Sequence, residues 1–212
     1  TSTGDYWEYD GEPIIRTFID MGRHECEGVE LLGFGGRIYA PWCSLPKYLR
    51  KVIQIDGDET IELDFQASHV NTLYRQVTGA IYEGGDPYSL TVSDTIIPRH
   101  IVKILSSILI NVLTFKSATL AIREHYKLPD EATSEQQQKA GDFDLTLEIV
   151  SIKDIANAYM DKHQAIDFYF LMGREMGHNI QYMESCIVMN VINELTVRGI
   201  PVLTIFDSFI IA

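Results

Sequence analysis

Apolar positions recur along the chain with two different spacings. The runs TIELDFQ (residues 60–66) and PVLTIFDSFIIA (residues 201–212) are short and rich in β-branched and aromatic residues, which is typical of strands. The second run is broken once, at Asp207-Ser208, so we expect a strand hairpin with its tip at that point. DGDE (residues 56–59) predicts a turn before the first run, with another strand ahead of it.

Helical spacing is clearest after the first strand run, where apolar residues share one face from Val70 to Val77 and Gly79 ends the pattern. Further helical patterns lie at about residues 14–21, 99–126, 152–170 and 180–197. The remaining segments are predicted as a loop or hairpin over residues 31–42, a loop over residues 83–90 and an exposed polar connection over residues 127–148.

The order of these elements is strand-rich first, then helical, then a helix followed by a strand hairpin. Because the two strand-rich parts need a partner to bury their apolar faces, we expect them to belong together. The pattern therefore predicts an α/β or α+β fold in which a helical insertion separates two parts of one sheet.

Composition narrows the class of protein. Of the 212 residues, 46% are hydrophobic and 22% are charged, which is ordinary for a globular protein with a sizeable core. Thirty acidic residues outweigh 17 basic ones and give a net charge of −13, which argues against a surface that coats nucleic acid generally. A local basic site remains compatible with this charge, and carboxylates that hold metal ions would add to it.

Cysteine usage and hydropathy indicate an intracellular, cytoplasmic protein. The three cysteines have no CxxC spacing, so neither a disulfide framework nor a zinc site is expected. The most apolar window, residues 101–115, is short for a membrane span and contains Lys103, so no membrane partner is predicted. The chain begins at Thr1 and stops within an apolar run, as expected of a fragment.

Two carboxylates interrupt the apolar strand patterns. Asp64 lies where the first run passes into a helix, and Asp207 lies at the hairpin tip. A buried unpaired carboxylate is costly, so such groups are usually paired, hydrogen-bonded or bound to metal. On adjacent strands the pair would suit two Mg²⁺ ions, or Mn²⁺ in their place, as used for in-line phosphoryl displacement. The alternative is structural: Asp64 would cap the helix and Asp207 would form an Asx turn.

A polar stripe runs along the helix predicted to begin at residue 99. Arg99, Lys103, Ser107 and Asn111 are each four residues apart, so they form one slanting row on an otherwise apolar helix. Arg99 and Lys103, one turn apart, would suit a triphosphate, with Arg acting through its fork and Lys as a point charge. The alternative is the solvated face of an amphipathic helix.

These pieces occur in an order that resembles the palm and fingers of family A DNA polymerases and the related phage-type single-subunit RNA polymerases. The resemblance covers roughly residues 33–212. It lies in motif A and its approach (residues 36–74), the loop DPYSLTVSD (86–94), an Arg-x3-Lys motif B helix (99–111) and a Gln-containing helix that leads into motif C (179–209).

The resemblance implies an antiparallel β-sheet polymerase palm with a helical fingers insertion. The palm would comprise residues 33–98, with motif A, and residues 151–212, with motif C. The fingers-like insertion with motif B would be residues 99–150, and residues 1–32 would form an N-terminal segment. A thumb is not evident in the sequence, so further protein segments are expected to supply one.

The resemblance also implies residue roles. Those at the chemical centre are the metal-binding and catalytic Asp64 and Asp207, with the Phe65 backbone carbonyl as a further metal ligand. Nucleotide binding would fall to Arg99, Lys103, His69 and Asn111, and nucleic-acid binding to Arg37, Gln181 and Phe206.

Three positions depart from the family pattern. Motif C has Phe206 where the family has His, next to Asp207 and Ser208. His69 stands where the DNA polymerases have a Glu that helps exclude ribose, and Asn111-Val112 replaces a Tyr-Gly pair near the nascent base pair. These changes leave open the choice between dNTP and NTP and between DNA and RNA templates.

The leading hypothesis is therefore template-directed nucleotidyl transfer on a primer–template, with nucleoside triphosphates as substrates and Mg²⁺ as cofactor. A phage or mobile-element origin would fit a compact polymerase of this kind. One alternative is a non-catalytic descendant of the palm that serves as a binding or assembly module. A two-metal nuclease is the third hypothesis, and it would explain Asp64 and Asp207 but not the Arg99–Lys103 pair.

Overall fold

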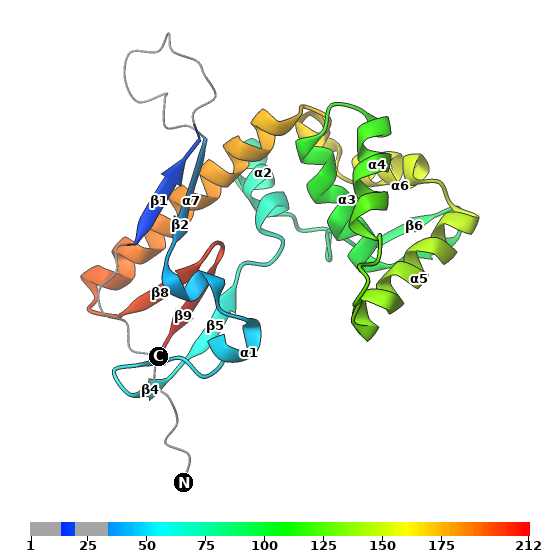
Figure 1. Ribbon diagram of the computed structural model, residues 1–212. Helices are drawn as coiled ribbons and strands as arrows, with labels where there is room; N and C mark the ends of the chain where they lie inside the picture. The colour runs from blue at the N-terminus through cyan, green and yellow to red at the C-terminus, as the bar shows by residue number, and fades with distance from the viewer. Residues whose placement is uncertain (1–13, 20–33) are drawn as a thin grey trace. The chain divides into compact units, whose positions relative to one another are not determined.

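The computed structural model describes residues 14–19 and 34–212. They form two compact units (Figure 1). The sheet unit contains the described part of residues 1–66 together with residues 181–212, and the helical unit contains residues 67–180. The sequence analysis predicts divisions after residues 32, 98 and 150 instead, and the assignment of those segments to a palm and fingers remains a prediction.

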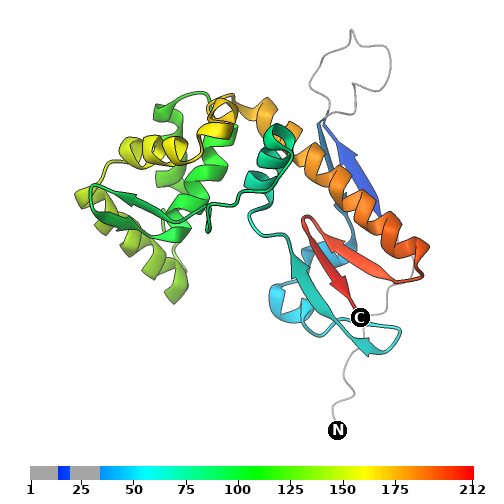
Figure 2. The same ribbon diagram turned by 180° about the vertical axis from the view of Figure 1, so that it is seen from behind.

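The centre of the sheet unit is a three-stranded antiparallel sheet (Figures 1 and 2). Its order is β5 (Ile61–Asp64), β9 (Ser208–Ile211) and β8 (Val202–Ile205), so β9 is paired on both sides. β8 and β9 form the hairpin that the broken apolar run predicts, joined by Phe206 and Asp207. The prediction of a hairpin at this point is confirmed.

The two faces of this sheet pack against different elements. On one face, Phe209 packs with Ile38 of β2 (Gly35–Tyr39) and Val188 of α7 (Arg174–Val197). The buried residues of the other face, Ile205 and Ile210, pack with the indole of Trp42. Because both faces bury apolar side chains, the β8–β9 hairpin is held in one orientation.

The rest of the sheet unit consists of short elements. They are β1 (Ile15–Phe18), which pairs with β2, then η2 (Pro41–Ser44), α1 (Lys47–Arg50), β3 (Gln54–Ile55) and β4 (Asp58–Glu59). The turn between β3 and β4 has Asp56 at φ 54° and Gly57 at φ 90°, as a tight Asp-Gly hairpin turn requires. The predicted DGDE turn is thus confirmed.

The helix expected over residues 14–21 is wrong in its described part, because residues 15–18 form strand β1. Ile15, Thr17 and Phe18 are β-branched or aromatic and favour extended backbone, and β2 supplies the pairing partner. Residues 20 and 21 of that prediction, and residues 31–33 of the predicted loop or hairpin, lie outside the described residues.

The helical unit contains α2 (Ser68–Thr78), the hairpin of β6 (Leu90–Val92) and β7 (Thr95–Ile97), α3 (Arg99–Asn111), α4 (Phe115–His125), α5 (Ser134–Ile149), α6 (Ile152–Lys162), η3 (Gln164–Tyr169) and the start of α7. The α2 prediction is confirmed, with Gly79 in the left-handed conformation at its end. The protein is therefore an α+β mixture of helices and small antiparallel sheets.

The single helix predicted over residues 99–126 is wrong, because the chain forms α3 and α4 with a break between them. Val112 is extended, with φ −114° and ψ 162°. Thr114 then begins α4 as its N-cap, where its hydroxyl accepts a hydrogen bond from the Ser117 N–H at 3.1 Å. A local side-chain cap thus overrides the apolar periodicity that runs through the break.

The polar segment 127–148 is also wrong as an exposed connection, because most of it belongs to α5. Thr133 and Gln136 form a capping box, in which each side chain accepts a hydrogen bond from the other residue's backbone N–H. The region predicted as one helix over residues 152–170 divides into α6 and η3, and α7 begins at Arg174 rather than near residue 180.

Among the residues that the structure describes, no helix has both the length and the apolar character needed to cross a membrane.

A buried histidine ties three segments of the helical unit together. His163 is 0% exposed, and its Nε2 lies 2.9 Å from the Pro87 carbonyl. Since a carbonyl can only accept, Nε2 carries the proton, and Nδ1 accepts from the Tyr74 hydroxyl at 3.1 Å. Burial lowers the pKa of His163, assisted by the nearby Lys162 ammonium and opposed by the bond to Pro87.

We expect stability to fall in acid because of His163. With its pKa lowered in the folded state, the unfolded chain binds the proton more readily, so stabilisation present above about pH 6.5 is lost as the pH falls through the folded pKa. Urea denaturation from about pH 7.5 to about pH 5 should show this decrease. His163→Gln should lower stability at neutral pH and flatten the pH dependence, whereas the exposed-site variant His125→Gln should not. Equal slopes for wild type and His163→Gln would contradict this assignment.

Candidate functional site

The pairing of β5 with β9 brings Asp64 and Asp207 to the same end of the sheet. Asp64 is the last residue of β5 and lies opposite Ser208, the first residue of β9. One position further, the Phe65 N–H donates a hydrogen bond to the Asp207 carbonyl at 3.4 Å. Asp64 is exposed and Asp207 is half-buried, so solvent reaches this end of the sheet.

The donor set at this end suits a hard divalent cation. Mg²⁺ is usually bound by one or two carboxylates, with water and substrate phosphates supplying its other oxygen ligands. The carboxylates of Asp64 and Asp207 and the carbonyl of Phe65 are donors of this kind. No group of three or more His, Cys, Asp or Glu residues suited to a metal occurs within residues 14–19 and 34–212.

The turn that carries Asp207 has an unusual backbone. Phe206 has φ 55°, in the left-handed region that favours glycine, at a cost of about 1–3 kcal/mol for a bulky residue. Two contacts hold its ring: Tyr39 meets it edge-on at 5.9 Å between centroids, and the Arg37 guanidinium carbon lies 5.1 Å from its centroid. The strain of the turn thus falls on Phe206, just before Asp207, at the position where the polymerase motif C has His.

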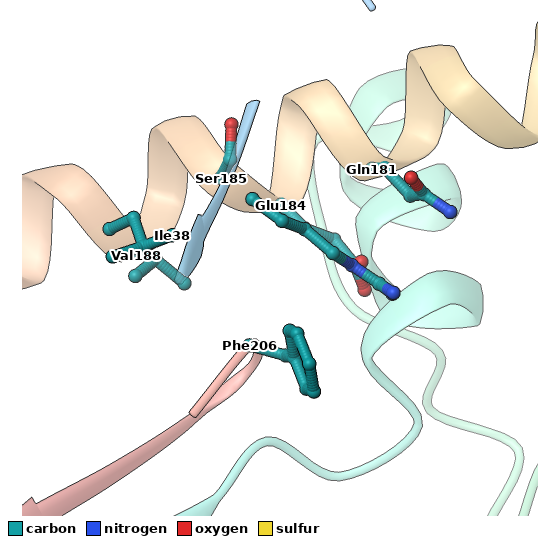
Figure 3. A pocket seen from close by; sticks show the side chains of 7 residues that line it. Ile38, Gln181, Glu184, Ser185, Val188 and Phe206 are labelled. Atoms are coloured by element: carbon teal, nitrogen blue, oxygen red, sulfur yellow. The ribbon is translucent and has the colours of Figure 1, made fainter. Parts of the chain in front are cut away.

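A small pocket lies beside this turn (Figure 3). Phe206 at the hairpin tip faces a row of α7 side chains across it. The lining residues are Arg37, Ile38, Gln181, Glu184, Ser185, Val188 and Phe206. Gln181, Glu184 and Val188 of α7 are three or four residues apart in turn and therefore share one side of the helix, with Ser185 next to Glu184. Arg37, Gln181 and Phe206, for which the resemblance implies nucleic-acid binding, meet in this one pocket.

An ionic contact beside Asp64 links β5 to its neighbours. Glu62 is two positions before Asp64, so its side chain lies on the same face of β5. It accepts a hydrogen bond from the Ser208 hydroxyl at 3.2 Å and pairs with the Arg50 guanidinium at 3.3 Å. Sequence reasoning missed this link, although the alternation of Glu62 and Asp64 in TIELDFQ was a signal that both share one face.

The outer strand of the hairpin is anchored by Trp42. Its indole Nε1 donates to the Thr204 carbonyl at 2.9 Å, and the Cys43 thiol lies 3.4 Å from the same oxygen. Trp42 is 4% exposed and Thr204 is also 4% exposed, so this bond is shielded from water. It fixes β8 two residues before the strained turn.

A second anchor joins β1, β2 and α7 at Ser185, one of the residues that line the pocket. Arg16 donates from Nε to the Gly36 carbonyl at 3.0 Å and from Nη2 to the Ser185 hydroxyl at 2.9 Å. Gly36 has φ 81°, and a Cβ added there would lie 2.5 Å from the Ser185 oxygen. Both the positive φ and the nearby Ser185 hydroxyl therefore favour glycine at this position.

The predicted nucleotide-binding residues lie in the helical unit. Arg99, Lys103 and Asn111 are exposed along α3, so the polar stripe expected from the sequence is present. Arg99 forms a two-pronged ion pair with Asp86. The sequence analysis predicts a loop at Asp86 but no functional role for it. Asn111 donates to the Ser107 carbonyl at 2.8 Å, and half-buried His69 belongs to the first turn of α2.

No protein-family model, curated protein or solved structure matches the chain. The resemblance to family A polymerases therefore rests on the motifs of this sequence and their order. The assignments of nucleotidyl transfer, of Mg²⁺ and of a nucleic-acid partner stay predictions.

The contacts among Arg16, Gly36 and Ser185 can be tested through the free energy of unfolding. Gly57→Ala at the open β3–β4 turn should cost about 1 kcal/mol through its positive φ alone, since nothing lies within 4 Å of the added Cβ. Gly36→Ala adds a clash to a similar φ and should cost about 1–3 kcal/mol more. Denaturant unfolding of the two variants isolates the packing term. Equal losses would show that the Ser185 hydroxyl accommodates the added methyl group without cost, against a structural role for this anchor.

Proposed function

We propose that this chain catalyses template-directed nucleotidyl transfer, adding nucleotides to the 3′ end of a primer. The observation that carries the proposal is the antiparallel pairing of β5 with β9, because it brings Asp64 and Asp207 to one end of one sheet. In sequence these residues are far apart and belong to different motifs. Their convergence is what a polymerase palm requires of its two carboxylates.

The reaction is a substitution at phosphorus. The primer 3′-oxygen forms a bond to the α-phosphorus of the incoming nucleotide, the bond to the bridging oxygen breaks, and pyrophosphate leaves with that electron pair. The proton of the 3′-hydroxyl is released to solvent. Asp64, Asp207 and the Phe65 carbonyl would hold Mg²⁺, for which Mn²⁺ is a substitute. When bound, the cation supplies charge neutralisation at the phosphate oxygens.

The residues of the sheet unit contribute mainly by rigidity. Trp42 fixes β8, and the Glu62–Ser208 hydrogen bond joins β5 to β9. A reacting group must be held in place because small misplacements cost rate. The strained Phe206 turn fits this role, since strain is stored where the surrounding structure can hold it.

The pocket next to Asp207 would receive the primer–template. Arg37 and Gln181 carry hydrogen-bond donors suited to base edges in the minor groove. Phe206 replaces the His of the family with an apolar ring, which can pack on a sugar or base but cannot donate a hydrogen bond. Arg99 and Lys103 would bind the triphosphate, with His69 and Asn111 near its sugar and base.

A second candidate is a non-catalytic palm descendant that binds or assembles with partners. This candidate is favoured because two arginines that were predicted to bind ligands contact groups of the protein itself. Arg37 lies over the Phe206 ring, and Arg99 pairs with Asp86. Titration with Mn²⁺, followed by paramagnetic broadening of nearby signals, separates the two candidates. Broadening around Asp64 and Asp207 favours the enzyme, and its absence together with no primer extension favours the binding module. A nuclease would cut labelled DNA without nucleotides.

The polymerase proposal predicts that either carboxylate is needed for extension. Asp64→Asn and Asp207→Asn should each lower Mg²⁺-dependent primer extension at least about a hundredfold, because a neutral amide loses the charge that holds the cation. Asp58→Asn, at an exposed position of β4 in the same unit, should keep wild-type extension. Assays with dNTPs and NTPs on DNA and RNA templates define the substrate. Wild-type extension by a folded Asp64→Asn or Asp207→Asn protein would refute these roles.

A further inference from the structure

Asp86 and Arg99 form a fork-to-fork ion pair at the start of α3. Arg99 donates from Nε to Oδ2 at 2.7 Å and from Nη2 to Oδ1 at 3.2 Å. Only one edge of the guanidinium is used. Of its five N–H donors, both on Nη1 and the second on Nη2 are directed away from this carboxylate. The Arg99 side chain is 58% exposed, so this outer edge is open to a second anion.

The orientation of Arg99 is fixed in a second direction by Tyr88. The guanidinium carbon lies over the Tyr88 ring, 5.0 Å from its centre, as in a cation–π contact. With one edge held by Asp86 and the cation held over Tyr88, the outer edge has a defined direction. An arginine held in this way loses less rotamer freedom when it binds a phosphate.

Asp86 is itself held in place. Its Oδ1 accepts a hydrogen bond from the Tyr88 N–H at 3.1 Å, and its carbonyl accepts one from the Lys162 ammonium at 2.8 Å. Lys162 also donates to the Ser89 carbonyl at 2.6 Å, which joins the loop to the end of α6. The hydrogen bond from Arg99 lowers the pKa of Asp86, so the carboxylate is charged at neutral pH.

We propose that Asp86 is a positioning residue that presents the outer edge of Arg99, together with Lys103, to the triphosphate of the incoming nucleotide. Lys103 is exposed one helical turn after Arg99, on the same stripe of α3. The inference rests on the proposed function for the identity of the anion. The opposite role is physically distinct: Asp86 would compete with phosphate for Arg99, and its removal would then tighten binding.

The sign of the effect on nucleotide affinity decides between these roles. Binding of dATP to the full chain is measured by titration calorimetry in EDTA, where the carboxylates of the sheet unit hold no cation. Asp86→Asn keeps an acceptor for the Tyr88 N–H but loses the two-pronged pairing, and it should weaken dATP binding about three- to tenfold. In the Arg99→Lys background the same change should have no further effect, because Asp86 acts through the Arg99 fork.

Glu135→Gln is the matched control, since it removes another exposed ion pair in the helical unit, with Lys139, and should leave dATP binding unchanged. Three outcomes would each overturn the inference. They are tighter dATP binding by Asp86→Asn, the same loss of affinity from Asp86→Asn in the Arg99→Lys background as in the wild type, and no dATP binding by the wild type. Asp64→Asn should lose extension yet bind dATP in EDTA as the wild type does. A wild-type chain that binds dATP through Arg99 but extends no primer would refute the proposed function and leave this assignment standing.

Discussion

The antiparallel pairing of β5 with β9 is the constraint on which the candidate site depends. β9 is hydrogen-bonded on both sides, so Ser208 is fixed against Asp64 on one side and against Ile205 on the other. The register of β9 is strongly specified because Ser208, Phe209 and Ile210 are buried, and a slip of one residue would exchange the side chains that the two faces of the sheet bury. The position of Asp207 relative to β5 follows from this register and from the two-residue turn.

The features predicted well from the sequence are those with local signals. Asp56-Gly57 determines its turn through the positive φ that both residues adopt, and Gly79 ends α2 for the same reason. The hairpin at Asp207 follows from a single break in an apolar run. The errors arise where a short-range hydrogen bond competes with periodicity, as at Thr114, or where a strand depends on a partner outside its own segment, as at β1. The capping box of Thr133 and Gln136 is a helix signal that can be recognised in the sequence. The polarity of the residues around it favoured an exposed connection instead.

The sequence motifs predict the residues of the candidate site, whereas the side chains that hold those residues in place are known only from the structure. Nothing in the sequence near Arg99 indicates that Asp86 would take one edge of its guanidinium, since the pair forms through a hairpin that the pattern did not predict. The same is true of Trp42 and Thr204, which are distant in sequence. The carboxylates of Glu62 and Asp86 pair with Arg50 and Arg99 and so hold these arginines in place within an acidic chain.

The long sequence separation between the paired strands β5 and β9 has a consequence for folding during synthesis. Glu62 and Ser208 are hydrogen-bonded across 146 positions of sequence, and the whole helical unit lies between them. The helical unit is synthesised before β9, and pairing of β5 with β9 must wait until β9 leaves the ribosome. Throughout that interval β5 lacks its partner strand, with Ile61 and Leu63 apolar at its edge. The carboxylates of the candidate site therefore come together only after the helical unit has been synthesised.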